Sequence, residues 1–278
     1  MLDTECFRDR VEAAAAAGAT GLALDLPRYR AFRARGETDA ELLAACRTSG
    51  VAVEEIWSYY GVLQAVDERR SDAILDRLLA LADTFGARMI GAPSGFDGNV
   101  DEAAERLARA CDRAAAYGIR LGLEFVAFTS LRDLATTWQV VAAAERDNVG
   151  IVLDCWHFFR GTPDLDLLAR LPGRLLEAVQ LNDGFLAPRA ADPLEEVRRF
   201  RPPPGEGEFD LHRLVEVVHR IAPGVRYCVE VGTDEMDALP PQAAAIRAAE
   251  PCHELLAAAR ADEPDTENEH PGPEERKR

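Results

Sequence analysis

The sequence predicts an α/β protein that folds as a (β/α)8 TIM barrel. The first observation is that apolar runs typical of buried parallel strands alternate with helical segments, seven times over ~250 residues. The second is that four of these runs end in a carboxylate or an amide, as expected where barrel strands open into one cavity. The third is that no GxGxxG motif follows an early strand, which argues against a doubly wound sheet, the alternative architecture.

Residues 1–98 combine helices that end at glycine with strands made of short apolar runs. Glycine ends a helix at no steric cost because it adopts the left-handed backbone conformation. In chain order we expect a helix over 4–17 ending at Gly18, a strand over 20–26 and a loop holding Arg28, Tyr29 and Arg30. A helix over 39–46 before Gly50 and a strand over 51–57 should follow. An amphipathic helix over 67–85 closed by Gly86 then leads to a strand over 88–92 and a loop over 93–98.

The same alternation continues to residue 261, and no pair of runs carries the turn signal of an antiparallel hairpin. We expect helices over 101–117, 131–145 and 165–169, each followed by a strand, over 120–125, 149–154 and 177–181. An irregular stretch comes next, with Arg198, Arg199, Arg201 and Gly205-Glu206-Gly207-Glu208. A helix over 210–221, a strand over 226–231 and a helix over 240–261 complete the series.

The chain begins with a helix, although a (β/α)8 barrel begins with a strand. Either the segment that forms the first strand is missing or truncated, or the barrel is open at that place, and the sequence leaves both readings open. We expect one barrel domain over residues 1–261. Residues 262–278 are rich in Glu, Asp and Pro and lack apolar anchors, so we expect an acidic, disordered tail.

Charge and hydropathy narrow the classes of partner. The chain of 278 residues has a formal charge of −17, with 49 acidic against 32 basic residues, which disfavours nucleic acid and anionic membranes as partners. No apolar run approaches the ~20 residues of a membrane span, and no charged-then-apolar leader precedes the first helix. The six cysteines are scattered without a CxxC pair, which indicates reduced thiols and a cytoplasmic location.

Lys277 is the only lysine, and it lies in the acidic tail. Schiff-base chemistry, lysine general bases and P-loop phosphate binding all need a positioned lysine. The residue inventory therefore excludes these mechanisms.

Four oxygen-bearing side chains follow successive predicted strands: Glu124, Asp154, Gln180 and Glu230. The steps between them are 30, 26 and 50 positions, which correspond to one βα unit, a second unit, and a third unit plus the irregular stretch. Because parallel strands end at one rim, we expect the side chains to share a cavity. Three carboxylates without a cation would repel one another, whereas Mg²⁺ and Mn²⁺ favour such oxygen-rich sites. The alternative is that each acid only caps a helix or ends a strand in solvent.

At this point the chain resembles the sugar phosphate isomerase/epimerase family, the xylose isomerase-like TIM barrels. The resemblance rests on Leu-Glu-Phe at 123–125, Leu-Asp-x-x-His at 153–157, Val-Gln-Leu-Asn-Asp at 179–183 and Val-Glu-Val at 229–231. It covers nearly the whole chain up to about residue 261.

The resemblance implies that Glu124, Asp154, Gln180 and Glu230 bind one divalent metal, Mn²⁺ or Mg²⁺ in first place and Co²⁺ or Zn²⁺ as alternatives. It implies catalytic proton transfer by Glu124 and Glu230, and a contact of His157 with a substrate oxygen. Many members have His where this chain has Gln180, and the dehydroshikimate dehydratase branch is one place where Gln occurs. Some of those dehydratases carry His two residues after the first Glu, where this chain has Val126.

Further polar and aromatic side chains follow predicted strands and are candidates for substrate binding. Arginines after strand ends can bind a phosphate or carboxylate, although a single loop arginine is more often simply solvated. Cys155 should point away from the cavity because neighbouring side chains on a strand alternate. The substrate-binding candidates are Arg28, Arg30, Arg160, Arg189, Trp57 and Glu206.

These expectations lead to a metal-dependent isomerase or epimerase of a small polyhydroxy carbonyl compound such as a sugar, sugar phosphate or cyclitol. A chelated cation would stabilise the enediolate formed when a carboxylate removes a proton next to the carbonyl. Loss of a β-hydroxyl from the same intermediate would give a dehydratase of the 3-dehydroshikimate type.

A catalytically silent barrel that serves as a binding subunit is a third reading. The related apurinic endonucleases have more histidines and a basic face, which this sequence lacks. A homo-oligomer is compatible with the sequence, which does not fix the oligomeric state.

Overall fold

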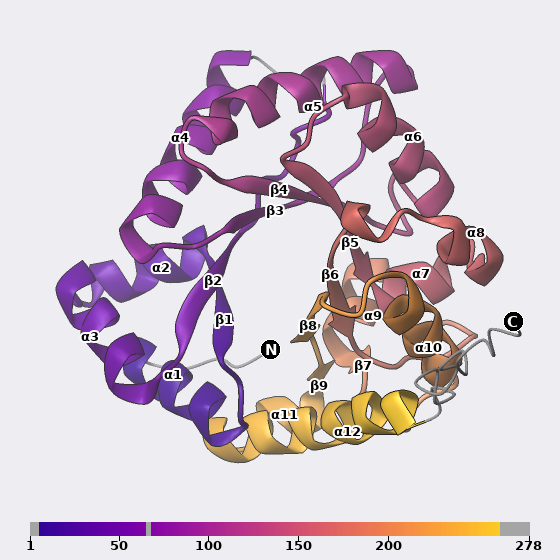
Figure 1. Cartoon of the computed structure of the whole chain (residues 1–278). Coiled ribbons are helices and arrows are strands. Elements are labelled where there is room, and N and C mark those ends of the chain that lie inside the picture. Colours follow the sequence, from indigo (N-terminus) through magenta and orange to yellow (C-terminus); the bar gives the residue numbers. More distant parts are fainter. Residues whose placement is uncertain (1–5, 65–67, 262–278) are drawn as a thin grey trace, which may run out of the picture.

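A computed structural model describes residues 6–64 and 68–261 and shows seven parallel strands arranged in a ring (Figure 1). Their order in the sheet follows their order in the chain, so each βα crossover places the next strand beside the previous one. The strands are β1 (Gly21–Asp25), β2 (Ala52–Trp57), β3 (Met89–Ser94), β4 (Arg120–Phe125), β5 (Val149–Asp154), β6 (Leu176–Leu181) and β8 (Arg226–Val229).

The predicted barrel is confirmed, and so is the irregularity at its start. Strands β8 and β1 are the two ends of the sheet order and do not pair with each other, so the barrel has an unsealed seam. Within the described residues no eighth strand fills this position. The seam leaves Val229 of β8 with 40% of its surface exposed, whereas every residue of β3 and β5 is buried.

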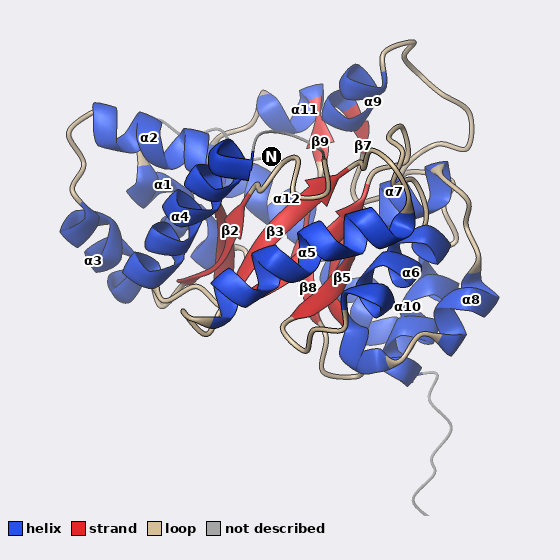
Figure 2. Cartoon of the chain, turned by 90° about the horizontal axis from the view of Figure 1, so that it is seen from above, coloured by secondary structure: helices blue, strands red, loops and turns tan. Residues whose placement is uncertain are grey.

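Helices surround the strands (Figures 1 and 2). They are α1 (Phe7–Ala16), α2 (Leu26–Ala34), α3 (Asp39–Ser49), α4 (Glu68–Phe85), α5 (Val100–Ala115), α6 (Leu134–Ala144), α7 (Cys155–Arg160), α8 (Leu165–Arg170), α9 (Pro193–Arg199), α10 (Leu211–Ile221), α11 (Asp234–Asp237) and α12 (Pro241–Ala261), with a 3₁₀ turn at Gly173–Leu175. None of the described helices is long and apolar enough to cross a membrane.

Local sequence signals explain where helices begin and end. Thr38 and Glu41 form a reciprocal capping box at the start of α3, and Gly50 ends that helix at a φ of 67°. Asn99 and Glu102 form the same box at the start of α5. Each box satisfies two backbone N–H groups that a helix terminus otherwise leaves unpaired.

Side chains of the strands fill the barrel interior as well as the layer under the helices. The ring of Trp57 lies against the backbone of Gly91, where a Cβ would come within 2.3 Å of it. Trp57 Nε1 donates to Glu55 Oε2 at 2.8 Å, and both side chains are buried. Trp57 also belongs to a small interior cluster with Met89, Val152 and Ala178.

The structure corrects several sequence expectations. Residues 28–30 belong to helix α2 and not to a loop, because Asp25 caps the helix and Pro27 favours its first turn. Helix α7 follows β5 directly, where no helix was expected. The irregular stretch contains helix α9 and strand β7 (Phe200–Arg201), which pairs antiparallel with β9 (Gly232–Thr233). Such a pair joins segments far apart in sequence and therefore carries no hairpin signal.

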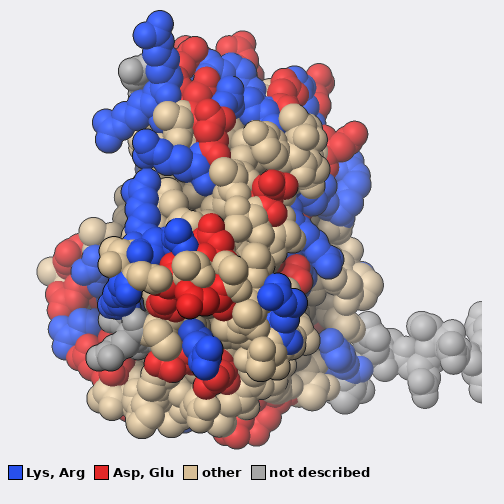
Figure 3. Space-filling model, turned by 90° about the vertical axis from the view of Figure 1, so that its left-hand side faces the viewer, with Lys and Arg blue, Asp and Glu red and all other residues tan. Residues whose placement is uncertain are grey.

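Acidic and basic side chains interleave on the face drawn in Figure 3, the left-hand side of Figure 1. Ion pairs between α4 and α5 illustrate this arrangement, since Arg113 lies 3.6 Å from Asp72 and also contacts Asp76. Exposed pairs of this kind contribute little stability each. The predicted acidic tail over 262–278 lies outside the described residues.

Candidate active site

Four neighbouring strands place the predicted oxygen ligands at the C-terminal rim of the barrel. Glu124 is the fifth residue of β4, Asp154 ends β5, Gln180 is the fifth residue of β6, and Glu230 directly follows β8. Asp154 and Gln180 are paired in the register of β5 and β6. Glu124, Asp154 and Gln180 are 6%, 0% and 5% exposed, so the rim holds buried oxygens of both charged and neutral kinds.

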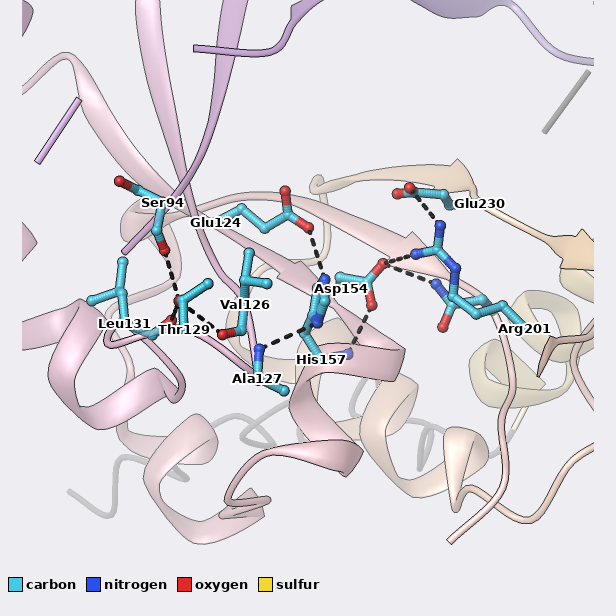
Figure 4. A network of polar contacts seen from close by, with 11 residues as sticks. Ser94, Glu124, Val126, Ala127, Thr129, Leu131, Asp154, His157, Arg201 and Glu230 are labelled. Atoms are coloured by element: carbon cyan, nitrogen blue, oxygen red, sulfur yellow. Dashed lines mark hydrogen bonds and ion pairs between the residues drawn. The ribbon is translucent and has the colours of Figure 1, made fainter. Parts of the chain in front are cut away.

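Arg201 connects two of these acids. Its Nη1 donates to Asp154 Oδ2 at 3.1 Å and its Nη2 donates to Glu230 Oε1 at 2.9 Å (Figure 4). The Arg201 side chain is 9% exposed. A buried guanidinium is tolerated only with anionic partners, so Arg201 and the acids stabilise one another's charges.

Asp154 is fixed by three donors. Its Oδ1 accepts from the backbone N–H of His157 at 2.9 Å, which also caps helix α7. Its Oδ2 accepts from Asn182 Nδ2 at 2.9 Å in addition to Arg201. The carboxylate therefore has one orientation, pointing along the rim toward Arg201.

His157 lies between Glu124 and the backbone of the β4–α6 loop (Figure 4). Its Nδ1 accepts from the N–H of Ala127 at 3.3 Å, which places the proton of a neutral imidazole on Nε2. His157 Nε2 lies 3.8 Å from Glu124 Oε1. Burial, reinforced by the positive charge of Arg201, lowers the pKa of His157 to about 3, so the ring is neutral and presents an N–H donor at the rim.

Burial raises the pKa values of two of the rim carboxyl groups, Glu124 and Asp154. Burial, then the charges of Glu230 and Asp154, raise the pKa of Glu124 well above its ordinary value. Burial also raises the pKa of Asp154, although Arg201 and the N–H of His157 act in the opposite direction. The single positive charge of Arg201 does not balance three carboxylates, so a second cation at this rim would reduce the repulsion between them.

The donor set fits a hard divalent cation. Gln180 Oε1 and Glu230 Oε2 are buried and have no hydrogen-bond donor, and such orphaned acceptors are costly unless a cation or water satisfies them. Together with the carboxylates of Glu124 and Asp154 they would supply four oxygens. Among residues 6–64 and 68–261, which the structure describes, no three His, Cys, Asp or Glu side chains form a group that could hold a metal ion as they stand, and Arg201 contacts two of the acids.

The sequence placed Arg201 in the irregular stretch without giving it a role, and the tertiary structure shows how it is positioned. It lies on β7, whose pairing with β9 registers Arg201 opposite Gly232. A Cβ at Gly232 would come within 2.8 Å of Arg198 O, so the close approach needs glycine. The only sequence signal is an arginine directly before a turn-rich segment that lies between two rim strands.

Asp183 holds the loop that follows Arg201. It is 2% exposed, and its carboxylate accepts from the backbone N–H groups of Gly205 and Phe209 at 2.9 and 3.1 Å. A Cβ at Gly207 would come within 2.3 Å of Asp183 Oδ1. The loop over 202–209 is thus tied to the end of β6, which keeps β7 at the rim.

Glu55 of β2 is a further interior acid that sequence reasoning missed. Besides accepting from Trp57, it lies 4.0 Å from Arg226 Nη2. Burial raises its pKa, as does the charge of Glu230. Trp57 therefore packs inside the barrel with its indole N–H engaged.

The arginines and the glutamate predicted to bind substrate lie outside the contacts of this network. Arg28 pairs with Asp25 at 3.6 Å, and Arg30 is exposed on α2. Arg160 Nη1 donates to the carbonyls of Phe185 and Leu186 at 2.9 and 2.7 Å. Arg189 stacks over the ring of Phe185 at 4.0 Å, and Glu206 pairs with Arg247 on α12.

Cys155 is fully buried at the start of α7, and burial raises the pKa of its thiol well above the ordinary value. It therefore remains a protonated core residue. This placement agrees with the expectation that its side chain points away from the rim.

Known proteins share both sequence and fold with this chain. The 3-dehydroshikimate dehydratase of Pseudomonas aeruginosa is 35% identical over 146 residues, which cover 51% of this chain and 22% of that protein. The inosose isomerase of Bacillus subtilis is 29% identical over 118 residues, covering 40% of this chain and 39% of the isomerase. The chain thus matches less than half of the length of these relatives.

A crystal structure of the IOLI protein with a bound zinc atom superposes with a TM-score of 0.81 at 18% identity, covering 90% of this chain and 92% of that one. At this identity the likeness concerns the fold. The sequence pattern of the xylose isomerase-like TIM barrel family matches residues 11–252. The chain therefore belongs to the xylose isomerase-like TIM barrel family.

Proposed function

We propose that the chain is a divalent-metal-dependent isomerase or epimerase of a small polyhydroxy carbonyl compound. The observation that carries this proposal is the set of buried oxygens on four neighbouring strands, two of which, Gln180 Oε1 and Glu230 Oε2, have no donor. Glu124, Asp154, Gln180 and Glu230 would hold the metal. When bound, Mn²⁺, Mg²⁺ or a related cation would stabilise negative charge on the substrate carbonyl oxygen.

The protein's own groups have distinct tasks in this proposal. Glu124 and Glu230 transfer the proton, one removing it and the other returning it to the substrate. The raised pKa of Glu124 suits this role, because a carboxyl that titrates nearer neutrality both accepts and releases a proton. His157 donates its Nε2–H to a substrate oxygen, and it keeps this role over a wide pH range because its pKa is about 3.

Arg201 would hold a developing oxyanion of the substrate close to the acids. Its guanidinium is already at the rim and has contacts to both Asp154 and Glu230. A fixed cation in a buried site stabilises negative charge more strongly than one in water, since the medium screens it less. Small-molecule substrates rich in oxygen match such a site.

A dehydratase is the second candidate, and the similarity to the Pseudomonas 3-dehydroshikimate dehydratase favours it. The same proton abstraction would be followed by loss of a hydroxyl group from the neighbouring carbon. Gln180 is compatible with this branch by the resemblance noted above, whereas Val126 departs from it. Both candidates share the acids and differ in the substrate that the rim accepts.

Two measurements test the proposal. Metal-free protein is titrated with Mn²⁺ or Mg²⁺ while binding heat and Tm are recorded; stoichiometric binding with a raised Tm is expected. Sugars, cyclitols and 3-dehydroshikimate are then incubated with the loaded protein in D₂O. Deuterium incorporation without loss of water identifies an isomerase or epimerase, and incorporation or turnover with loss of water identifies the dehydratase. No metal binding at any concentration together with no exchange would overturn both and favour a silent binding barrel.

A further inference from the structure

A backbone group in the loop between β4 and α6 determines which nitrogen of His157 carries the ring proton. The N–H of Ala127 donates to His157 Nδ1 at 3.3 Å. A peptide N–H can only donate, so Nδ1 must offer its lone pair and the proton of the ring must lie on Nε2. Nε2 is the nitrogen that lies 3.8 Å from Glu124 Oε1. The direction of one peptide N–H therefore decides whether His157 presents a donor or an acceptor at the rim.

Ala127 lies in a short turn over residues 126–131, directly after β4. The N–H of Val126 donates to Leu131 O at 2.8 Å, and the N–H of Thr129 donates to Val126 O at 2.8 Å. Both hydrogen bonds lie within the turn. The direction in which the whole turn faces, and with it the Ala127 N–H, therefore depends on contacts with neighbouring segments.

Thr129 makes such a contact through its hydroxyl group (Figure 4). Its Oγ1 lies 3.1 Å from Ser94 O at the end of β3, 2.9 Å from Val126 O and 3.2 Å from Leu131 O. A hydroxyl has one proton to donate, and here three carbonyl oxygens surround it as acceptors. Ser94 is the register partner of Phe125, the last residue of β4. Thr129 thus ties both ends of the turn to the neighbouring strand.

A second contact holds the turn beside the loop that follows β3. Ser130 Oγ donates to Phe96 O and accepts from the N–H of Phe96, both at 2.7 Å. A Cβ at Gly95 would come within 2.9 Å of Ser130 Oγ and 3.2 Å of Thr129 Cβ, so the close approach of the two loops needs glycine. Ser130 is exposed and Thr129 is half-buried, so water competes less with the contacts of Thr129.

The same turn carries one of two aromatic rings that flank the imidazole. The Phe128 ring centroid lies 5.8 Å from that of His157, and the Trp156 ring centroid lies 5.2 Å from it on the side of α7. Both rings meet the imidazole at steep angles, edge against face. A shift of the turn would therefore move the donor to Nδ1 and a ring beside the imidazole together.

We propose that Thr129 is a positioning residue of the active site, which holds the turn against β3, aims the Ala127 N–H at His157 Nδ1 and so keeps the ring proton on Nε2. Its effect on catalysis rests on the proposed function, in which His157 donates Nε2–H to a substrate oxygen. With the proton on Nδ1, the nitrogen at the rim would present a lone pair to that oxygen, and two acceptors do not bind each other.

The test observes each ring nitrogen directly. Full-length protein labelled with ¹⁵N-histidine is studied by long-range ¹H–¹⁵N NMR with Mg²⁺ present, and the His157 signals are assigned by their loss in His157→Gln. We expect wild type to show Nε2 protonated and Nδ1 unprotonated. Thr129→Val removes the hydroxyl at nearly constant shape, and we expect signals of both tautomers. Solvent-deuterium exchange into inosose or 3-dehydroshikimate should fall by about tenfold.

Two variants separate positioning from a general loss of stability. Thr129→Ser keeps the hydroxyl and should restore both the wild-type His157 signals and the exchange rate. Thr137→Val is the matched control, because Thr137 is buried and its Oγ1 donates to Asp133 O at 2.7 Å at the start of α6. It should lower Tm but leave the His157 signals unchanged. Thr129→Ala replaces Thr129→Val if the extra methyl group does not fit among the three carbonyls.

Three results would overturn the proposal: a proton on Nδ1 in wild type, a single Nε2–H tautomer in the variant that lacks the Thr129 hydroxyl, or His157 signals that change equally in Thr137→Val or are not restored by Thr129→Ser. A wild type that exchanges deuterium into neither probe would count against the proposed function instead. The His157 signals would still decide the role of Thr129, because they are measured without a substrate.

Discussion

Arg201 Nη1 lies 3.1 Å from Asp154 Oδ2, and this contact joins a two-residue strand to the end of a barrel strand 47 positions earlier in the chain. Asp154 is fully buried and Arg201 nearly so. Strand β7 belongs to the antiparallel β7–β9 pair, which lies outside the barrel sheet. Through Arg201 this pair places a positive charge at the rim. Its energetic role can be measured.

Arg201→Met should destabilise the metal-free protein by about 3–5 kcal/mol at neutral pH, because it leaves buried acids without their cation. Added Mn²⁺ should restore part of the loss if the acids hold a metal. Urea unfolding followed by circular dichroism measures both effects. Arg88→Met is the control: this side chain is 76% exposed with one contact at 3.6 Å, and a change within about 0.5 kcal/mol is expected. Equal effects of the two variants would show that the Arg201 pairs contribute no special stability.

Glu230→Gln should abolish proton transfer while the fold remains intact. The amide keeps the shape of the side chain and its hydrogen bond from Arg201, but it cannot accept a proton as a base does. We expect solvent-deuterium exchange into the substrate to fall by about 10²–10⁴-fold. Glu216→Gln, which removes a half-exposed acid on α10, serves as the control for a charge change elsewhere. Exchange at the wild-type rate in Glu230→Gln would refute its role in proton transfer.

The lowered pKa of His157 should make the free energy of unfolding depend on pH. The unfolded chain binds a proton at His157 near pH ~6.5, whereas the folded protein resists protonation until about pH 3, mainly because the ring is buried. Unfolding therefore takes up a proton in this window, and the contribution of neutral His157 is lost as pH falls from 6.5 toward 3. The difference reaches about 5 kcal/mol at the acid end.

His157→Gln should consequently flatten the acid side of the stability curve of the metal-free protein. The measurement is the free energy of unfolding from pH 7 to pH 4 in the presence of a chelator. His253→Gln, on the exposed side of α12, should leave the curve unchanged. A wild-type slope in His157→Gln would mean that other groups cause the acid sensitivity.

Gly91→Ala should destabilise the barrel interior by about 1–3 kcal/mol, because its Cβ would come within 2.3 Å of the Trp57 ring. Trp57→Ala should remove most of this penalty, so the double variant tests the contact directly. Gly224→Ala is the matched control, since nothing lies within 4 Å of a Cβ there. Thermal unfolding distinguishes the cases, and an additive double variant would show that the ring is not the cause.

Several features could be predicted from the sequence because their signals are local. The strands β4 and β5 have the predicted bounds, since each is an apolar run between a helix-ending glycine or turn and a carboxylate. The sequence left open whether the first strand is missing or the barrel is open, and the structure shows an unpaired seam between β8 and β1. The position of Glu124, Asp154 and Gln180 on neighbouring strands at one rim also follows from the alternation, because parallel βα units deliver every strand end to the same side.

Other features depend on contacts between distant segments. Helix α2 was mistaken for a loop because its cap, Asp25, is also the last residue of a strand. The β7–β9 pair could not be predicted from a turn motif, since its two strands are 30 residues apart in the chain. A position after a strand end or in a loop does not determine where a side chain points. Arg160, Arg189 and Glu206 each contact a carbonyl, a ring or another helix instead of the acids.

The sequence by itself determined the barrel and the oxygen-bearing residues at the strand ends, because periodicity and strand polarity are properties of short segments. The tertiary structure alone decided that Arg201 is the cation among the acids and that His157 is neutral. These depend on burial and on which remote groups approach within hydrogen-bonding distance, and no run of neighbouring residues encodes either.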